Sequence, residues 1–465
     1  MIFFKMPKLA LGKRTAILPI VQGGMGVGIS LSGLATAVAE EGGIGVIAAN
    51  AIGMIEPDYY ADGRAANIRA LRREIRQARA RTAGMIGVNI MVAVNDFPQL
   101  LETAISEKVD ILFLGAGLPI KGIPVKAIRA AGTEVAPIVS SRRAAELIFK
   151  YWEKAYQDVP DAVVVEGPLA GGHLGFKPEQ LDDPAFALEK IVPEVVAAVA
   201  PFQKAFHKTI PVIAAGGIFS GQDIWRFLQL GAQGVQMATR FVATHECDAD
   251  QRFKDAYVTC RREDLTIIKS PVGMPGRAIR NRFLDDAAAG IRNVTRCAWR
   301  CLESCDIKNS VYCISAALNH ARQGQLEHGF AFAGANAYRV ERIVSVRELL
   351  GELKVEYEAA LIKSFTTLKE EYLNVIDRGF ASLHREYERA RQRVDRRWRV
   401  CSQAWGKKIV AVREEYEKAA AHWQTLKKEY DGVIQKLNVL KVQFPERLLE
   451  LQAIIRRYPA VPDPF

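Results

Sequence analysis

The stretch DAVVVEGPLAGGHLGF, residues 161–176, joins a run of β-branched residues to a glycine-rich loop. The apolar run has the length of a buried strand, and Glu166 follows at its carboxyl end. His173 comes directly after the paired glycines Gly171 and Gly172. A strand that ends in a polar residue and a flexible loop is typical of the active face of an α/β protein. This stretch therefore predicts both a fold class and a site.

Short apolar runs that end in Gly, Asn or Ser recur along the chain, and most are separated by longer amphipathic segments. The candidate strands are AILPIVQ (16–22), IGVIAA (44–49), MIGVNIMV (85–92), ILFLGAG (111–117), EVAPIVS (134–140), DAVVVEG (161–167), PVIAAGG (211–217) and GVQMAT (234–239). The candidate helices span 32–41, 65–83, 97–108, 141–157, 184–200 and 220–230. This alternation predicts parallel strands joined by helices. Eight strands favour an α/β fold of the TIM (β/α)8 barrel type, with a doubly wound sheet as the alternative.

From about residue 346 the composition and the hydrophobic pattern change. Glycine and proline become rare, and apolar residues repeat every three or four positions. We therefore expect a barrel domain over 1–350 and an α-helical extension over 351–465. The spacing predicts a helical hairpin or a coiled coil, which needs a partner helix or a second copy of the chain. The repeating residues are Leu361, Phe365, Leu368, Tyr372, Val375, and then Trp405, Ile409, Val412, Tyr416, Ala419, Trp423, Leu426, Tyr430, Val433, Leu437, Leu440 and Phe444.

The overall composition is that of a globular protein. Of the 465 residues, 49% are hydrophobic and 25% are charged, which argues against a disordered chain. The net charge of +11 favours anionic partners only through the long-range field. The basic residues are spread through helical segments without an RNA-binding motif, so we expect no specific nucleic-acid partner.

The cysteines and the apolar segments indicate a cytoplasmic protein. Seven cysteines in this length do not suggest a secreted disulfide scaffold. The first residues, MIFFKMPKLALGK, hold too short an apolar run for a signal peptide. The most apolar window, residues 31–55, contains Glu40, Glu41 and five glycines, so we expect no transmembrane segment.

Three glycine-rich turns follow candidate strands. In VQGGMGVGIS (21–30) two adjacent glycines let the backbone approach a ligand, but the order and the missing acidic residue do not support a Rossmann dinucleotide site. The other two turns follow the seventh and eighth strands, where a barrel builds its phosphate site. For the turn after the seventh strand, capping of the following helix by Ser220 and Asp223 is the alternative function. The N–H groups expected to bind phosphate belong to Gly216, Gly217, Ala238 and Thr239.

The loop that carries His173 is predicted to lie above the same barrel mouth. An imidazole there can remove a proton next to an activating group or donate one to a developing anion. A structural histidine is the alternative, and the nearby phosphate-type turns favour the catalytic one.

Five segments together resemble the nitronate monooxygenase family, once called 2-nitropropane dioxygenases. These segments are PIVQGGMGVGIS, VVVEGPLAGGHLG, PVIAAGGI, GVQMATRF and PVGMPGRAIRN. The resemblance covers about residues 10–350, and the family also includes flavin-dependent enoyl-ACP reductases and NAD(P)H-dependent flavin oxidoreductases. It implies a TIM barrel that holds FMN non-covalently, with His173 as the catalytic acid or base. Ala238 stands where relatives usually carry glycine, which implies a tighter phosphate turn.

The resemblance also implies positions for the cofactor. Gly171 and Gly172 would give clearance for the flavin ring. Other residues would line the ring or hold the phosphate. Those around the ring are Gly23, Gly24, Met25, Asn89, Ser140 and Glu166, and those around the phosphate are Gly216, Gly217, Gln236, Ala238 and Thr239.

Three functions stay open at this stage. The resemblance implies oxidation of alkyl nitronates with O2 to a carbonyl compound and nitrite. It equally allows a reductase in which NAD(P)H reduces FMN and hydride passes to an enoyl thioester or a quinone. The third possibility is a non-catalytic barrel scaffold whose coiled coil is the working part. The first two need a small-molecule substrate.

Four cysteines fall within CAWRCLESCDIKNSVYC, residues 297–313. On a helix the first three would share one face. Four thiolates could ligate an iron–sulfur cluster, which would favour an electron-transfer reductase, or zinc. The spacing matches no strong metal motif, so buried free thiols are the alternative. The four are Cys297, Cys301, Cys305 and Cys313, and the other three cysteines show no partner pattern. The next glycine-bearing segment, FAFAGANAYRV (330–340), could close over the barrel mouth or anchor the last helix.

Overall fold

The computed structural model describes residues 6–293, 297, 299–302 and 304–377, together with isolated helical residues between 389 and 435. The chain forms two compact units, of which one ends at Glu358 and the other begins at Ala359. The second apolar repeat, from Trp405 to Phe444, lies outside the described residues. The coiled coil therefore stays a prediction.

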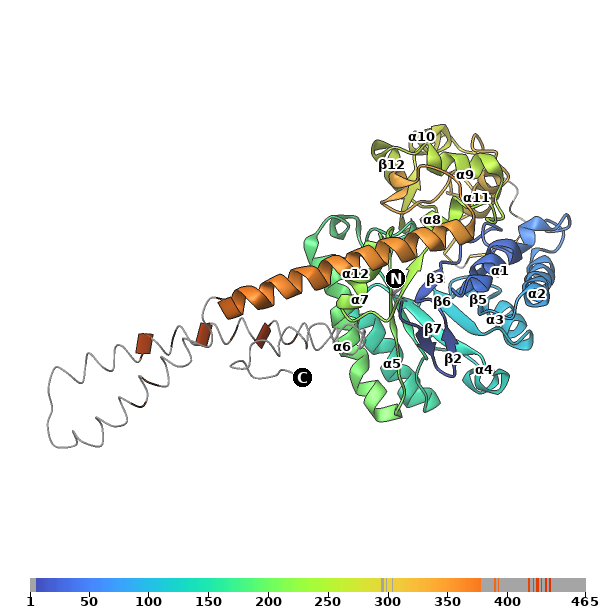
Figure 1. Ribbon diagram of the computed structural model, residues 1–465. Coiled ribbons are helices and arrows are strands. Elements are labelled where there is room, and N and C mark those ends of the chain that lie inside the picture. Colours follow the sequence, from blue (N-terminus) through green and yellow to red (C-terminus); the bar gives the residue numbers. More distant parts are fainter. Residues whose placement is uncertain are drawn as a thin grey trace. The chain divides into compact units, whose positions relative to one another are not determined.

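The eight candidate strands form one closed parallel sheet (Figure 1). The edges meet where Val21 pairs with Ile44, and the Gln22 N–H donates to the Ile44 carbonyl at 3.0 Å. This closure confirms the TIM barrel and excludes the doubly wound sheet. In barrel order the strands are β3 (Ile20–Gln22), β11 (Gly234–Met237), β10 (Val212–Ala215), β8 (Val163–Glu166), β7 (Glu134–Val139), β6 (Ile111–Gly115), β5 (Ile86–Met91) and β4 (Gly45–Ala48).

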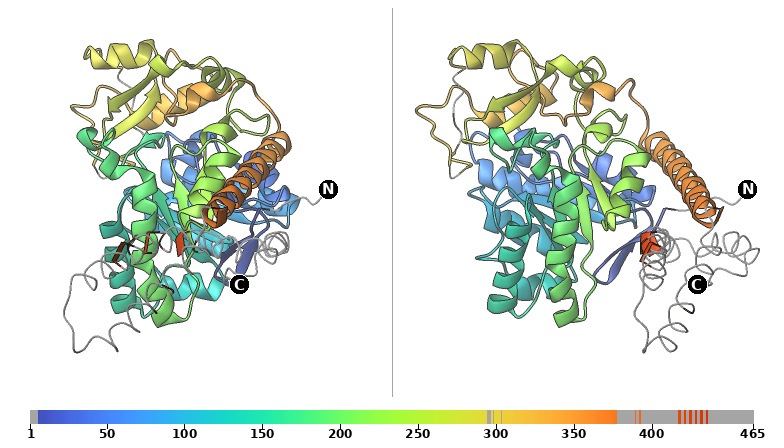
Figure 2. Two further views of the ribbon diagram at one scale, coloured as in Figure 1. Left: turned by 60° about the vertical axis from the view of Figure 1, so that its left-hand side comes forward. Right: turned by 90° about the vertical axis from the view of Figure 1, so that its left-hand side faces the viewer.

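Helices flank the strands on the outside of the barrel, as the two views of Figure 2 show. The six predicted helices are present, together with two short helices that the pattern did not predict, α4 between β6 and β7 and α8 after β11. The barrel helices are α1 (Ser32–Glu40), α2 (Gly63–Arg81), α3 (Phe97–Ser106), α4 (Val125–Ala131), α5 (Arg142–Tyr156), α6 (Leu188–Phe206), α7 (Gly221–Gln229) and α8 (Thr239–Val242).

The amino-terminal end of the barrel is closed by a hairpin, β1 (Leu9–Leu11) and β2 (Arg14–Ala16). The sequence predicted one strand over 16–22, but Ala16 ends the hairpin and β3 begins only after Pro19, which has no N–H to donate to a sheet. Leu9 and Leu11 are fully buried in the apolar core that fills the barrel. Burial of these two side chains explains why the hairpin forms.

The segment after β11 forms a cap, which Figure 1 shows as α9, α10, α11 and β12 gathered together. Its strands pair with β9, a two-residue strand from the loop after β8, in an antiparallel sheet of order β12-β13-β9. The elements are β9 (Gly172–His173), α9 (Gln251–Val258), β12 (Leu265–Lys269), β13 (Pro275–Ile279), α10 (Arg282–Ala288) and α11 (Ile314–Arg322). Single 3-10 turns occur at η1 (Ile52–Ile55), η2 (Pro178–Gln180), η3 (Pro184–Phe186), η4 (Arg262–Asp264) and η5 (Ala337–Arg339).

The last described helix, α12 (Val346–Asp377), begins where the composition changes. Its first turns belong to the barrel unit: the Gly221 N–H donates to the Glu356 carboxylate at 2.6 Å, and the buried Tyr357 ring meets Trp225 edge to face. These contacts place the unit boundary at Glu358 rather than at residue 350. Among the described residues, no helix is both long and apolar enough to cross a membrane.

Candidate active site

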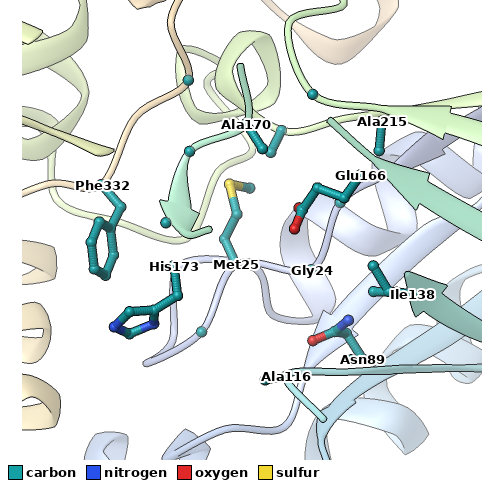
Figure 3. A pocket seen from close by; sticks show the side chains of 18 of the residues that line it. Gly24, Met25, Asn89, Ala116, Ile138, Glu166, Ala170, His173, Ala215 and Phe332 are labelled. Carbon is teal, nitrogen blue, oxygen red and sulfur yellow. The ribbon is translucent and has the colours of Figure 1, made fainter. Parts of the chain in front are cut away.

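A cavity of about 520 Å³ lies at the carboxyl ends of the barrel strands, within the size range of small-molecule and cofactor sites (Figure 3). All the residues that the sequence singled out for the catalytic and cofactor site line it, because parallel strands bring their carboxyl ends to one face. They are Gly23, Gly24, Met25, Asn89, Ser140, Glu166, Gly171, Gly172, His173, Gly216, Gly217, Gln236, Ala238 and Thr239.

The turns after β10 and β11 form a cradle of backbone N–H groups. Gly216 and Gly217 have φ values of +92° and +81°, a region that a side chain would strain. A Cβ on Gly216 would also lie 2.9 Å from the Gly167 carbonyl oxygen. No backbone carbonyl of the described residues accepts a hydrogen bond from the N–H groups of these two glycines, of Ala238 or of Thr239. Unpaired N–H groups in two neighbouring turns suit a phosphate.

Ala238, which the resemblance to the family implies would tighten the cradle, lies beside Gly23. Its φ of −124° is negative and so lies outside the left-handed region that favours glycine. Its methyl group has room because residue 23 is glycine: a Cβ on Gly23 would lie 3.3 Å from the Ala238 Cβ. The Thr239 hydroxyl accepts the Gly334 N–H at 3.2 Å, which ties the cradle to the cap.

The first glycine-rich turn packs closely against its neighbours. A Cβ on Gly24 would lie 2.5 Å from the Asn89 Cβ, so only glycine fits beside that amide. The Gly23 N–H donates to the Met237 carbonyl at 2.8 Å. Val27, in the same turn, has φ +60°, which is strained for a β-branched residue. Strain of this kind is concentrated at functional sites, although the sequence analysis did not single out Val27.

His173 belongs to strand β9 and not to a free loop, which corrects the sequence-based expectation. It pairs with Gly276 of β13. The two glycines before it have different tasks from the clearance that the sequence suggested. A Cβ on Gly171 would lie 2.5 Å from the Ala333 backbone, so this glycine permits close packing of the cap. Gly172 has open space around it and is required by its φ of +80°.

Two cap residues hold the His173 ring. The Ser270 hydroxyl lies 2.7 Å from Nε2, and the Phe332 ring meets the imidazole edge to face at 5.1 Å between centroids. Burial of the ring among protein atoms lowers the pKa of His173 to about 4. The imidazole is therefore neutral at pH 7 and able to accept a proton.

Glu166, at the end of β8, points into the same cavity (Figure 3). Burial raises the pKa of its carboxyl group to about 7. No described residue gives this carboxyl a hydrogen bond or an ion pair, and the residues that line the cavity include no lysine and no arginine. Near neutral pH the carboxyl is therefore a mixture of protonated and ionised forms.

The cap supplies lining residues that the sequence analysis did not name. They include Tyr257, Met274 and Ile314. The segment 330–340 closes over the cavity, because Phe332, Ala333 and Gly334 line it and the Asn336 amide donates to the Gly217 carbonyl at 2.6 Å. Ser270 lies 97 positions after His173, so no local spacing could have paired the two.

The four-cysteine segment lies beside the cavity. All four thiols are free and half-buried. The described residues between 297 and 313 form no helix, so the helical face expected for the first three is wrong. Across the parts of the chain that can be described, no group of three or more His, Cys, Asp or Glu side chains is arranged to hold a metal ion.

Comparison with known proteins agrees with this geometry. The family model described as nitronate monooxygenase matches residues 9–356. The chain belongs to the nitronate monooxygenase family. A probable nitronate monooxygenase from Staphylococcus aureus (strain Newman) is 29% identical over 306 residues, which cover 58% of this chain and 77% of the relative. The family and these relatives make the chain an oxidoreductase of this family.

Solved structures support the fold of this family member. FabK from Thermotoga maritima is 28% identical with a TM-score of 0.57, and the match covers 75% of this chain and 95% of FabK. A nitroalkane oxidase from Streptomyces ansochromogenes has a TM-score of 0.58 at 24% identity, with 75% and 98% of the two chains covered. At that identity the second likeness shows the fold alone.

Proposed function

We propose that this chain binds FMN and oxidises alkyl nitronates with O2 to a carbonyl compound and nitrite. The observation that carries the proposal is the combination, in one cavity, of a neutral imidazole at His173 and a cradle of unpaired backbone N–H groups. The imidazole can remove a proton from carbon, and the N–H groups can bind a phosphate. The membership of the nitronate monooxygenase family supports the same assignment.

The residues present fit FMN. The N–H groups of Gly216, Gly217, Ala238 and Thr239 would hold its phosphate. Gly24, which lies close to Asn89, has no side chain that could enter the space for the cofactor. Gly23, Met25, Ser140, Glu166 and Gln236 would line the rest of the cofactor site. When bound, FMN would supply the electron transfer and the reaction with oxygen.

The chain itself would handle the proton and the orientation of the substrate. With a pKa of about 4, His173 has a free lone pair at neutral pH and can remove the proton next to a nitro group or orient the nitronate already formed. Ser270 and Phe332 hold the ring in one orientation, so little motion is needed during proton transfer. These contacts with the cap also cover part of the ring and reduce its exposure to water.

A specific observation also favours a second function, an NAD(P)H-dependent FMN reductase acting on an enoyl thioester or a quinone. The match to FabK extends over 95% of that chain at 28% identity. In such an enzyme protonated His173 would donate a proton to the product, and with a pKa of about 4 the protonated imidazole is scarce at neutral pH. For this reason we rank the reductase second.

Two measurements on the full chain test these proposals. Purified protein reconstituted with FMN should show a flavin absorption spectrum and should form nitrite from an alkyl nitronate without NAD(P)H. Anaerobic mixing with NADPH should leave the flavin oxidised. Rapid bleaching by NADPH without nitrite formation would support the reductase instead, and a chain that binds no FMN would refute both.

A further inference from the structure

We propose that Arg277 is a positioning residue that turns two further backbone N–H groups, those of Leu169 and Gly171, toward the phosphate of the cofactor. The inference rests on the FMN site of the proposed function and extends that site to a residue that does not line the cavity. Three observations carry it: the burial of Arg277, the two carbonyls that its side chain holds, and the contact of their loop with the phosphate cradle.

Arg277 is a buried cation in the cap. It belongs to β13, and only 7% of the residue is exposed. No described Asp or Glu side chain forms an ion pair with it, although the charge of Asp182 reaches it. Burial lowers the pKa of the guanidinium, which nevertheless stays protonated at neutral pH. A buried charge without an ion-pair partner is rare and needs compensation from other polar groups.

The guanidinium finds this compensation in the loop between β8 and β9. Its Nη1 donates to the Pro168 carbonyl at 2.6 Å and to the Ala170 carbonyl at 2.9 Å. The backbone of Arg277 also pairs with Gly172, where the loop enters β9. Two carbonyls of the loop therefore face one cation, which fixes the orientation of their peptide planes.

The orientation of these peptide planes decides where their N–H groups point. The described chain has no cis peptide bond, so the N–H of each peptide points away from its C=O. The two N–H groups concerned belong to Leu169 and Gly171, and they point to the side of the loop away from Arg277. Both residues line the cavity, as does Ala170 between them (Figure 3). No described group accepts a hydrogen bond from either N–H, so both are available to a ligand.

The loop lies directly against the phosphate cradle. A Cβ on Gly216 would lie 3.1 Å from the Ala170 nitrogen, and a Cβ on Gly217 would lie 2.8 Å from the Leu169 Cβ. The unpaired N–H groups of the loop and of the cradle thus belong to adjoining segments. A phosphate group has several acceptor oxygens, so N–H groups from both segments can bind one anion.

The buried charge explains how a cavity without a lining lysine or arginine could bind an anion. The negative end of each peptide dipole, the carbonyl oxygen, faces the guanidinium, and the positive end, the N–H, faces the other way. A carbonyl that accepts from a cation also makes the N–H of its own peptide a stronger donor. Arg277 therefore favours an anion in the cavity without touching it.

The test is the affinity of the flavin-free full chain for FMN and for riboflavin, which has the same ring system and lacks the phosphate. Arg277→Met should weaken FMN binding roughly 10- to 100-fold, the loss of charge-assisted hydrogen bonds, and should leave riboflavin binding nearly unchanged. Arg277→Lys keeps the charge and should recover most of the FMN affinity. Arg280→Met is the matched control, because it removes an exposed arginine just after β13, and it should bind both flavins as the unaltered chain does.

A second measurement, on the unaltered chain, does not depend on the folding of a variant. Hydrogen exchange of the backbone amides in residues 169–172 should slow more on binding of FMN than on binding of riboflavin. The inference is overturned if both flavins slow this exchange equally, if Arg277→Met weakens the binding of both flavins alike, or if it weakens neither. An unaltered chain that binds neither flavin would overturn the FMN site itself, and this inference with it.

Discussion

The two ends of the barrel differ in whether their buried acidic side chains have ion-pair partners. At the amino-terminal end Asp110 pairs with Arg14 and, at 2.6 Å, with Arg79. Asp161, also at this end, pairs at 2.5 Å with both Arg129 and Lys208. At the carboxyl end Glu166 has no such partner among the described residues, and no lysine or arginine lines its cavity.

The paired charges stabilise one end of the sheet, and the unpaired polar groups at the other end are available for function. Both ends are built from the same eight strands, so the fold itself does not decide which charges are paired. Paired charges at the amino-terminal end satisfy each other and hold the hairpin and helices in place. Unpaired polar groups at the carboxyl end cost stability and are left available for a ligand, as is usual for the active face of a TIM barrel.

The largest expected effect is on catalysis at the carboxyl end. His173→Gln should lower turnover of the nitronate by roughly 10²- to 10⁴-fold, because the base is lost while a polar side chain of similar size remains. FMN binding, measured by fluorescence titration, should change little. His328→Gln alters an exposed histidine and serves as the control. Full activity in the His173 variant would show that this end is not the catalytic one, or that another residue is the base.

The next effect is on stability at the amino-terminal end. Asp161→Asn removes the carboxylate that both Arg129 and Lys208 meet at 2.5 Å and should lower the free energy of unfolding by about 2–3 kcal/mol. The loss is less than for a wholly buried pair, because both cations keep about a quarter of their surface exposed and Asp158 still pairs with both. Urea unfolding measures this change. Asp58→Asn, which breaks an exposed pair with Arg69, should have almost no effect. If both variants lost the same free energy of unfolding, the ion pairs at the amino-terminal end would contribute no more to stability than an exposed pair does.

A smaller effect is expected from the partner of the catalytic ring. Ser270→Ala removes the hydroxyl 2.7 Å from His173 Nε2 and should lower kcat by roughly tenfold through looser positioning. KM and FMN affinity should stay the same, and Ser270→Thr should restore kcat because it keeps the hydroxyl. A fall in FMN affinity with unchanged kcat would assign Ser270 a purely structural role in the cap.

The smallest effect, at most about 1.4 kcal/mol per pH unit, is a slope in the pH dependence of stability. The folded chain raises the pKa of Glu166 from 4.5 to about 7, so it binds that proton more tightly than the unfolded chain does. This contribution to stability is fully present below pH 4.5 and is lost as the pH rises through 7. Glu166→Gln should flatten that part of the curve, as measured by the Tm of flavin-free protein. Parallel curves for the two proteins would mean that the carboxyl is not desolvated.

Much of the fold could be predicted from the residues, because the signals involved are local. Short β-branched runs separated by amphipathic segments indicated all eight barrel strands and six of the helices around them. The phosphate turns and Glu166 followed from the same count, since parallel strands end at one face, whereas Met25, Asn89, Ser140 and Gln236 were implied only by the resemblance to the family. The hairpin was missed because the apolar run 16–22 hides a break at Pro19, and α4 was missed because it has only seven residues.

Other features depend on contacts between distant segments. The position of His173 on β9 requires β13, and its orientation requires Ser270, 97 positions away. The need for glycine at Gly171 comes from the backbone at Ala333, which only folding brings close. No spacing rule connects such positions, so the resemblance to a family could name the site but not its geometry.

The sequence by itself therefore determined the parallel barrel and the face that carries the site, because periodicity and strand polarity are local properties of the chain. The tertiary structure alone decided which charges are paired. Asp161 meets two cations at one end and Glu166 meets none at the other, although both belong to the same sixteen-residue stretch, residues 161–176. Partners are set by what packs nearby in space, and burial shifts a pKa only after that packing exists.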